Sequence, residues 1–227
     1  MVKHDSQVPR GAFLQRDRET YAVVPRFAPA GVLDAATLRR LADVVEKYRI
    51  PAVKLTGAQR VALVGLKPED VEPVLTELGV EPAPAVGLSV HYVKACSGTT
   101  FCRFGQQDAL SLGAHLDELL VGYGDLAHKF KVGISGCVFN CCESWLRDFG
   151  AFGRPEGWTV VVGGLGSGRP RIGNEVAREV DDAGVVTLAQ KTLELYQELG
   201  RKGERLGRTI DRVGKEIFIA RLLGNLA

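Results

Sequence analysis

The sequence contains no long hydrophobic run. No stretch approaches the roughly 18 uninterrupted apolar residues that a membrane-spanning helix needs, and residues 1–20 are polar, without the apolar core of a secretory signal peptide. Charge of one sign is also not in excess, because 29 Lys and Arg against 27 Asp and Glu give a formal net charge of +2. We therefore expect a cytoplasmic protein with neither a membrane nor a nucleic acid as its partner.

Cysteines are few and unevenly distributed. All five cysteines of the 227-residue chain lie between Cys96 and Cys142. A disulfide scaffold would spread an even number of cysteines through a small secreted chain, so these residues are better interpreted as ligands. Hydrophobic residues make up 45% and charged residues 25% of the chain, which is typical of a globular protein with a buried core.

The N-terminal part alternates strand and helix patterns. Residues 21–27 predict a strand, and Asp34 is placed to cap an amphipathic helix that ends before Pro51. The elements predicted after it are strands at 52–56 and 61–65, a helix at 68–78 and a fourth strand at 86–90. This order predicts an α+β layer, half of a ferredoxin-like sandwich. The stiff segment 81–84, with two prolines, is the predicted domain boundary.

The C-terminal part begins at the cysteines. The elements predicted there are helices at 104–120, 187–199 and 208–223 and strands at 129–135 and 158–162. We therefore predict two domains, 18–84 and 85–227, and an α+β fold.

Four of the cysteines form two spaced pairs, Cys96-x5-Cys102 and Cys137-x3-Cys141. Structural zinc sites usually repeat the short Cys-x2-Cys motif, which neither pair has. A 4Fe-4S cluster accepts wider and unequal spacings, because each thiolate binds a different corner of a bulky body. The spacing favours an iron-sulfur cluster, with a zinc site and buried free thiols as alternatives.

The neighbours of the two pairs fit the cluster interpretation. Gly98 lies inside the first pair and Gly136 directly before the second, and both would let the backbone approach a cluster closely. Cys142 is left over, and we expect its side chain to point elsewhere.

Two lysines precede the second cysteine pair in a predicted strand. Residues two apart share a face, so Lys129 and Lys131 project to one side and Phe130 to the other. Such a pair favours a bound anion. Burial and mutual repulsion should lower the lysine pKa values, while the anion would raise them. An ordinary surface pair is the alternative. Further members of the same basic patch are Lys94, Lys54, Arg60 and Arg103.

Residues 163–171 form a glycine-rich segment that contains Arg169 and Arg171. It fails the dinucleotide-binding fingerprint, because Arg169 stands where the third glycine should be, and it lacks the Lys-Ser/Thr ending of a P-loop. A glycine turn with two arginines can hold carboxylates. The alternative is an ordinary hairpin.

Three features occur together: the cysteine pairs, Lys-Phe-Lys-Val-Gly-Ile-Ser-Gly-Cys at 129–137, and Gly-Gly-Leu-Gly-Ser-Gly-Arg at 163–169. Together they resemble the sulfite and nitrite reductase haemoprotein family. The N-terminal part looks like that family's ferredoxin-like half-domain, through Val-Pro-Arg at 24–26, Gly-Val at 31–32 and Lys-Leu-Thr-Gly-Ala-Gln-Arg at 54–60. Full-size relatives carry this module twice, so the resemblance implies a compact enzyme, either a monomer or a homodimer.

The resemblance implies a 4Fe-4S cluster coupled to sirohaem. Cys96, Cys102, Cys137 and Cys141 would hold the cluster, with Cys141 bridging it to the sirohaem iron. Lys129 and Lys131 would face the position where sulfite or nitrite binds, with Arg26 and Lys94 as further anion contacts. The residues implied for the sirohaem carboxylates are Lys54, Arg60, Arg103, Arg169 and Arg171.

The implied activity is the six-electron reduction of sulfite to sulfide by an assimilatory-type enzyme. An external donor such as ferredoxin would supply the electrons. The alternatives are nitrite reduction to ammonia with the same cofactors, a sirohaem-free iron-sulfur electron carrier, and a zinc-stabilised binding module. Between Cys137 and Cys141 the chain has Val-Phe-Asn where many relatives carry Pro-Asn and a small residue, so the hydrogen bonds around the cluster and its reduction potential should differ.

Overall fold

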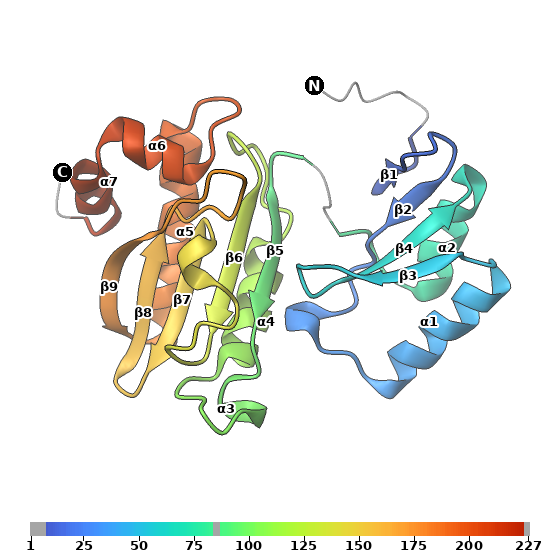
Figure 1. The fold of residues 1–227 in the computed structure, drawn as a ribbon, viewed down its shortest axis with the longest axis horizontal. Helices are drawn as coiled ribbons and strands as arrows, with labels where there is room; N and C mark the ends of the chain where they lie inside the picture. The colour runs from blue at the N-terminus through green and yellow to red at the C-terminus, as the bar shows by residue number, and fades with distance from the viewer. Residues whose placement is uncertain (1–7, 84–86, 225–227) are drawn as a thin grey trace. The chain divides into compact units, whose positions relative to one another are not determined.

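The computed structural model describes residues 8–83 and 87–224 of the chain (Figure 1). The chain divides into two compact units, residues 1–86 and 87–227. Each unit combines one sheet with helices, so the α+β prediction is confirmed. No helix within the two described ranges is both long and apolar enough to span a membrane.

The N-terminal unit is a four-stranded antiparallel sheet with strand order β1-β2-β4-β3. Its elements are the strands β1 (Ala12–Leu14), β2 (Tyr21–Val23), β3 (Ala52–Leu55) and β4 (Val61–Leu66), the helices α1 (Ala35–Lys47) and α2 (Val71–Leu78), and the 3-10 turns η1 (Pro29–Gly31) and η2 (Pro68–Asp70). Buried side chains of both helices, such as Leu41 and Val74, share one core with Leu63 of the sheet. Asp34 caps α1 as predicted, since its carboxylate accepts the Thr37 N–H at 2.7 Å.

The fourth strand of this sheet is not the one predicted at 86–90. It is β1, which comes from the polar N-terminal segment and has too few residues to show the alternation of a strand. Residue 86 lies outside the described residues, and Val90 begins a strand of the other unit. The strand predicted at 21–27 ends at Val23, shortly before Pro25, which has no N–H to donate.

The C-terminal unit is a five-stranded sheet with strand order β5-β6-β7-β8-β9. Its strands are β5 (Val90–Ala95), β6 (Phe130–Ser135), β7 (Phe149–Arg154), β8 (Gly157–Val162) and β9 (Asn174–Val180). Its helices are α3 (Gly98–Phe101), α4 (Ala109–Leu120), α5 (Asp182–Leu199), α6 (Leu206–Val213) and α7 (Lys215–Leu222), with a 3-10 turn η3 (Ser144–Leu146). Strands β5, β6 and β7 are parallel, and β8 and β9 continue the sheet antiparallel.

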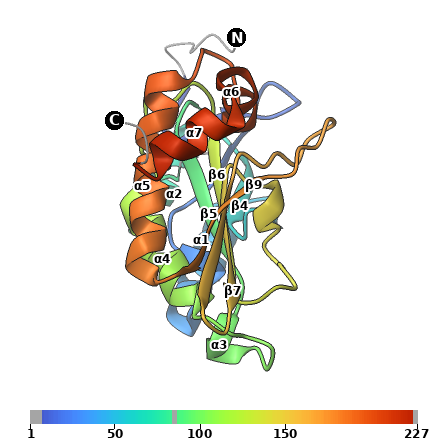
Figure 2. The same ribbon diagram turned by 90° about the vertical axis from the view of Figure 1, so that its left-hand side faces the viewer.

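The two faces of this sheet are covered differently. Figure 2 shows α4 and α5 on one face and the yellow segment between β6 and β7, which contains η3, on the other. The Phe130 side chain is fully buried, whereas Lys129 and Lys131 on either side of it are half-buried. The alternation predicted for residues 129–131 is therefore confirmed, whereas residues 132–135 are all buried.

Three helices of this unit differ from the prediction. The helix predicted at 104–120 begins at Ala109, because Asp108 caps it by accepting the Ser111 N–H at 3.1 Å. The helix predicted at 208–223 is two helices, separated at Gly214, whose φ of 103° is incompatible with a continuous helix. The helix predicted at 187–199 begins earlier, at Asp182, because Asp181 provides its cap.

Candidate functional site

The two cysteine pairs follow neighbouring parallel strands. Cys96 comes directly after β5 and Cys137 shortly after β6, so both lie at the same edge of the sheet. The Cys96 N–H donates to the Ile134 carbonyl at 3.1 Å, and the Gly136 N–H donates to the Cys96 sulfur at 3.0 Å. The pairing of β5 with β6 thus brings the cysteine pair after β5 next to the cysteine pair after β6.

Glycine contacts bring the two cysteine loops together. A Cβ atom added to Gly136 would lie 2.5 Å from the Cα of Gly98, which itself has a φ of 51°. The Gly136 carbonyl accepts the N–H groups of Gln106 and Gln107 at 2.8 and 3.0 Å. Two backbones therefore pack at a distance that a larger residue would prevent.

The four predicted ligand cysteines act on one another electrostatically. Burial raises the pKa of Cys141, and Cys96, Cys137 and Cys102 raise it further. Cys141 is exposed, whereas Cys137 is buried. Among the residues described, no three His, Cys, Asp or Glu side chains converge as a single metal ion would require. We call the two cysteine loops and the glycine contact between them the cysteine cradle. The four thiols that these loops carry are a donor set that fits an iron-sulfur cluster.

The prediction that Cys142 points away from the other cysteines is wrong. Its thiol donates a hydrogen bond to Cys96, which is the chief reason that the pKa of Cys96 is lowered to about 5. The same hydrogen bond, together with burial, raises the pKa of Cys142. The spacing showed only that Cys142 is not needed as a fourth cluster ligand. No sequence pattern predicts the turn that brings Cys142 back to Cys96 at the end of β5.

Buried hydroxyl groups hold the loop that carries Cys141 and Cys142. The Ser135 hydroxyl accepts the Cys142 N–H at 3.0 Å and donates to the Asn140 side-chain oxygen at 3.1 Å. That oxygen also accepts the Ser144 N–H at 2.8 Å, and the Ser144 hydroxyl donates to the Ala151 carbonyl at 2.8 Å. Both serines are fully buried, and Asn140 is part of the loop's internal bonding.

A cluster of basic side chains surrounds the first residues of β6. Burial lowers the pKa of Lys131, and the charges of Lys129, Arg205 and Arg147 lower it further, while Asp148 opposes them. This is the direction predicted for cations that share a half-buried face. We call these four cations, Lys129, Lys131, Arg147 and Arg205, the basic cluster.

Lys94 lies beside the basic cluster. Its ammonium is 3.3 Å from the Glu143 carboxylate, which also forms an ion pair with Arg147. The Arg147 guanidinium donates to the Tyr92 hydroxyl at 3.1 Å, and Lys131 Nζ lies 5.8 Å from the centre of the Tyr92 ring. Tyr92 therefore connects Lys131 to the residues around Lys94.

The lysines and the cysteines lie at opposite ends of β6. Cys137 is six positions after Lys131, which corresponds to about 20 Å in an extended strand. The loop after β6 folds back along the strand, because a Cβ on Gly133 would lie 2.7 Å from the carbonyl oxygen of Cys142. Arg147 at the end of this loop thereby reaches Lys131.

The remaining predicted site residues are not part of the basic cluster. The Arg171 guanidinium binds Asp211 at 2.7 Å and the Gly163 carbonyl at 2.8 Å, so it ties the glycine-rich segment to α6. Arg169 is exposed, and Arg103 stacks on Phe104 with 4.6 Å between the guanidinium carbon and the ring centre. Arg26, Lys54 and Arg60 belong to the N-terminal unit, in which Arg26 and Lys54 are exposed and Arg60 is buried.

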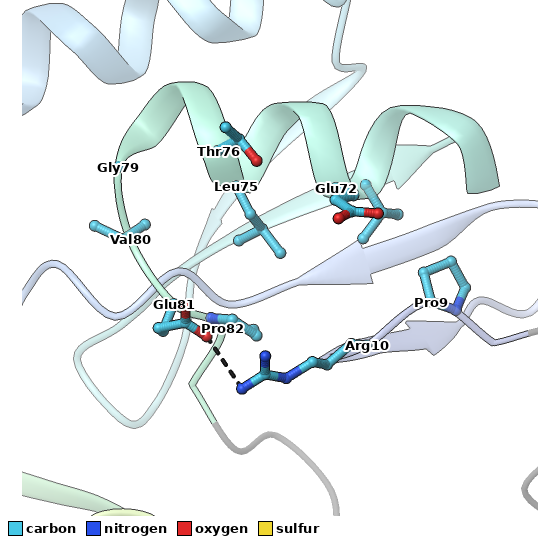
Figure 3. A pocket seen from close by; sticks show the side chains of 10 residues that line it. Pro9, Arg10, Glu72, Leu75, Thr76, Gly79, Val80, Glu81 and Pro82 are labelled. Carbon is cyan, nitrogen blue, oxygen red and sulfur yellow. Dashed lines mark ion pairs between the residues drawn. The ribbon is translucent and has the colours of Figure 1, made fainter.

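A pocket in the N-terminal unit holds none of the predicted site residues. It lies between α2 and the segment before β1, as Figure 3 shows, and an exposed ion pair between Arg10 and Glu81 at 3.2 Å borders it. Its lining carries no group that fits the chemistry of the cysteine site.

Sequence reasoning missed Arg147, Asp148 and Arg205. Asp148 is fully buried, and its carboxylate binds the Arg205 guanidinium at 2.5 Å. The two are 57 positions apart, and neither belongs to a motif with recognisable spacing. The one available signal was the Arg-Asp pair directly before an apolar strand, which is too common to indicate a site.

Family models match both units. Residues 87–226 match the nitrite and sulphite reductase 4Fe-4S domain, and residues 13–80 match the nitrite/sulfite reductase ferredoxin-like half domain. The chain is 45% identical over 219 residues to an assimilatory-type sulfite reductase of Nitratidesulfovibrio vulgaris, covering 96% of this chain and all of the relative. It is 40% identical to the nitrite reductase [NAD(P)H] of Bacillus subtilis, covering 89% of this chain and 25% of that protein.

Two solved structures share the fold. A crystal structure of dissimilatory sulfite reductase I superposes with a TM-score of 0.78 at 15% identity, covering 92% of this chain and 70% of that one. The Mycobacterium tuberculosis NirA protein superposes with a TM-score of 0.79 at 21% identity, covering 91% of this chain and 40% of that one. Since two family models and a full-length relative agree, the chain belongs to the nitrite and sulphite reductase family.

Proposed function

We propose that the protein is an assimilatory-type sulfite reductase that reduces sulfite to sulfide with a 4Fe-4S cluster and sirohaem. The observation that carries this proposal is the full-length similarity to an assimilatory-type sulfite reductase, which covers 100% of that relative. The cysteine cradle and the basic cluster in one unit support it, because an electron carrier alone needs no anion site.

The four spaced cysteines would hold the cluster. Cys96 and Cys102 come from the loop after β5, and Cys137 and Cys141 from the loop after β6. Cys141 is the exposed member of the second pair, which suits it to face a neighbouring cofactor. When bound, sirohaem would supply an iron that binds the substrate and accepts electrons from the cluster.

The basic cluster would bind the oxyanion and supply protons. Bisulfite needs six electrons and six protons to become hydrosulfide and three water molecules. A half-buried ammonium with a lowered pKa, such as that of Lys131, releases a proton more readily than a solvated lysine. Lys129 and Lys94 would add attraction for the anion, and Arg26 is a further candidate from the N-terminal unit.

The wider basic set would hold the carboxylates of sirohaem. We propose this role for Arg103 and Arg169, which are exposed, and for Lys54 and Arg60 of the half-domain. Arg171 is the weakest of the predicted candidates, because Asp211 already binds its guanidinium.

Electrons would come from a separate donor protein such as ferredoxin, since the glycine-rich segment lacks a nucleotide fingerprint. We propose either a monomer or a homodimer as the working form.

Nitrite reduction is the second candidate function. Its support is the 40% identity to a nitrite reductase over 89% of this chain, although the chain spans only a quarter of that protein. The test is steady-state reduction of sulfite and of nitrite by the anaerobically purified protein with a chemically reduced electron donor. We expect a higher kcat/KM for sulfite with sulfide as its product, and a higher value for nitrite would reverse the assignment.

A further inference from the structure

We propose that Asp148 and Arg205 form a positioning pair that fixes Lys131 at the edge of the anion site and balances its charge. The inference rests on the proposed function only in that Lys131 would serve the bound anion. Neither family similarity nor sequence spacing assigns a role to either residue.

The Asp148 carboxylate is fully occupied by two partners. Its Oδ2 atom accepts the backbone N–H of Lys131 at 2.9 Å and Arg205 Nη2 at 2.5 Å, and its Oδ1 atom accepts Arg205 Nε at 3.2 Å. The side chain is fully buried. A carboxylate in this arrangement cannot reach a substrate, so any influence on the anion site must pass through Lys131 or Arg205.

The pair acts where the strand ladder begins. The register of β6 and β7 starts with Val132 opposite Phe149, one residue after Lys131 and Asp148. The Asp148 side chain therefore binds the backbone N–H of Lys131, directly before the pairing of β6 with β7 begins. The Asp148 backbone carbonyl accepts the Gly163 N–H at 2.7 Å. Lys131 is held at its backbone, so its side chain starts from a fixed position.

Charges from several elements surround Lys131. Lys129 directly precedes β6, Arg147 comes from the loop before β7, and Arg205 comes from the segment before α6. His128 responds to the same charges, since burial lowers its pKa and Arg205, Lys129 and Lys131 lower it further. Glu143 forms an ion pair with Arg147, and the Tyr92 ring lies beside Lys131. Asp148 supplies the negative charge that opposes these cations at Lys131.

The segment that carries Arg205 is itself fixed. The Gly203 N–H donates to the Ala127 carbonyl at 2.9 Å, next to the start of β6. The buried Tyr196 hydroxyl donates to the Glu204 carbonyl at 2.5 Å. Arg205 is thus presented to Asp148 from a rigid position, and its ion pair opposes the rise that burial causes in the pKa of Asp148.

The test uses two substitutions with opposite expected signs. Asp148→Asn removes the negative charge beside Lys131, so the pKa of Lys131 should fall. Arg205→Gln removes a positive charge, so the same pKa should rise. The readout is the pH dependence of Lys131 acylation by an amine-reactive reagent, followed by peptide mass spectrometry on the holoenzyme. Glu198→Gln is the matched control, because it breaks a carboxylate–arginine pair with Arg221 between α5 and α7.

The second readout is the pH profile of kcat/KM for sulfite. Its basic limb should move to lower pH in Asp148→Asn and to higher pH in Arg205→Gln, by about one unit each, with the visible spectrum of the cofactors retained. Structural damage alone would lower activity in both variants without opposite shifts.

Unchanged acylation pKa values in folded variants overturn the inference and leave the proposed function intact. If Asp148→Asn does not fold, Arg205→Gln decides alone. The inference is then overturned if the pKa of Lys131 does not rise in Arg205→Gln. If the wild-type protein does not reduce sulfite, the proposed function fails, while the acylation shifts still decide the role of the pair.

Discussion

Replacing Gly136 by alanine should disrupt the cysteine cradle. The added Cβ would lie 2.5 Å from the Gly98 Cα and 2.9 Å from the Gln107 carbonyl oxygen. Ordinary contact between carbon atoms begins near 3.5 Å, so the two loops must separate by about 1 Å. Gly98 cannot move away, because Gly105 already packs closely against it. A Cβ added to Gly105 would lie only 2.4 Å from the carbonyl carbon of Gly98.

The expected cost follows from this overlap. Overpacking of this kind destabilises by about 1–3 kcal/mol, and each kcal/mol lowers Tm by about 2–4 °C for a domain of this size. We therefore expect a fall in Tm of several degrees, together with loss of iron and acid-labile sulfide from the purified protein, because the two cysteine pairs no longer meet around one cluster.

The assay combines thermal unfolding with iron and sulfide analysis of protein purified without oxygen. Gly124→Ala is the control, since the nearest atom to its added Cβ is 3.8 Å away. A Gly136→Ala protein with a full cluster content and the wild-type Tm would refute the contact between the two loops as the basis of the cradle.

Four further substitutions test the site and one ion pair outside it. Lys129→Ala and Lys131→Ala should each reduce sulfite turnover by about 10²-fold or more while both cofactors stay bound; the exposed Lys191→Ala is the control, and unchanged turnover would remove the two lysines from the site. Cys142→Ala should retain the cluster but lower its reduction potential in redox titration, because Cys96 loses a hydrogen-bond donor; loss of the cluster would instead make Cys142 a ligand. Glu204→Gln should destabilise the protein at neutral pH, because the ion pair with Arg212 lowers the pKa of Glu204 to about 2. That stabilisation is present above the unfolded pKa of Glu and is lost as the pH falls toward 2, so the Tm difference between variant and wild type should shrink over this range and would contradict the assignment if it grew.

Local patterns predicted the elements whose physical signal is contained in a few neighbouring residues. Asp34 reads as a cap because its carboxylate bonds within its own turn. Lys129 and Lys131 flank the buried Phe130 because a strand alternates its faces. The glycines beside the cysteines matter because their missing side chains make room for another backbone, and this is visible at Gly98 and Gly136.

Features that depend on distant partners were not predictable. Strand β1 has three residues and forms through pairing with β2, so its own pattern is too short to detect. The hydrogen bond between Cys142 and Cys96 depends on how the loop after β6 folds back. Asp148 and Arg205 meet only after β7 and the segment before α6 are in place. No pattern in the sequence around either residue predicts their contact.

The most direct test of a sirohaem- and cluster-dependent sulfite reductase is the visible spectrum of anaerobically purified protein, recorded before and after addition of sulfite. We expect strong chlorin-type Soret and red bands that shift when sulfite binds, with iron and sulfide contents that match one 4Fe-4S cluster and one sirohaem per chain. A broad shoulder near 400 nm alone, roughly as expected for iron-sulfur charge transfer, would leave only an electron carrier. A colourless protein would contradict both.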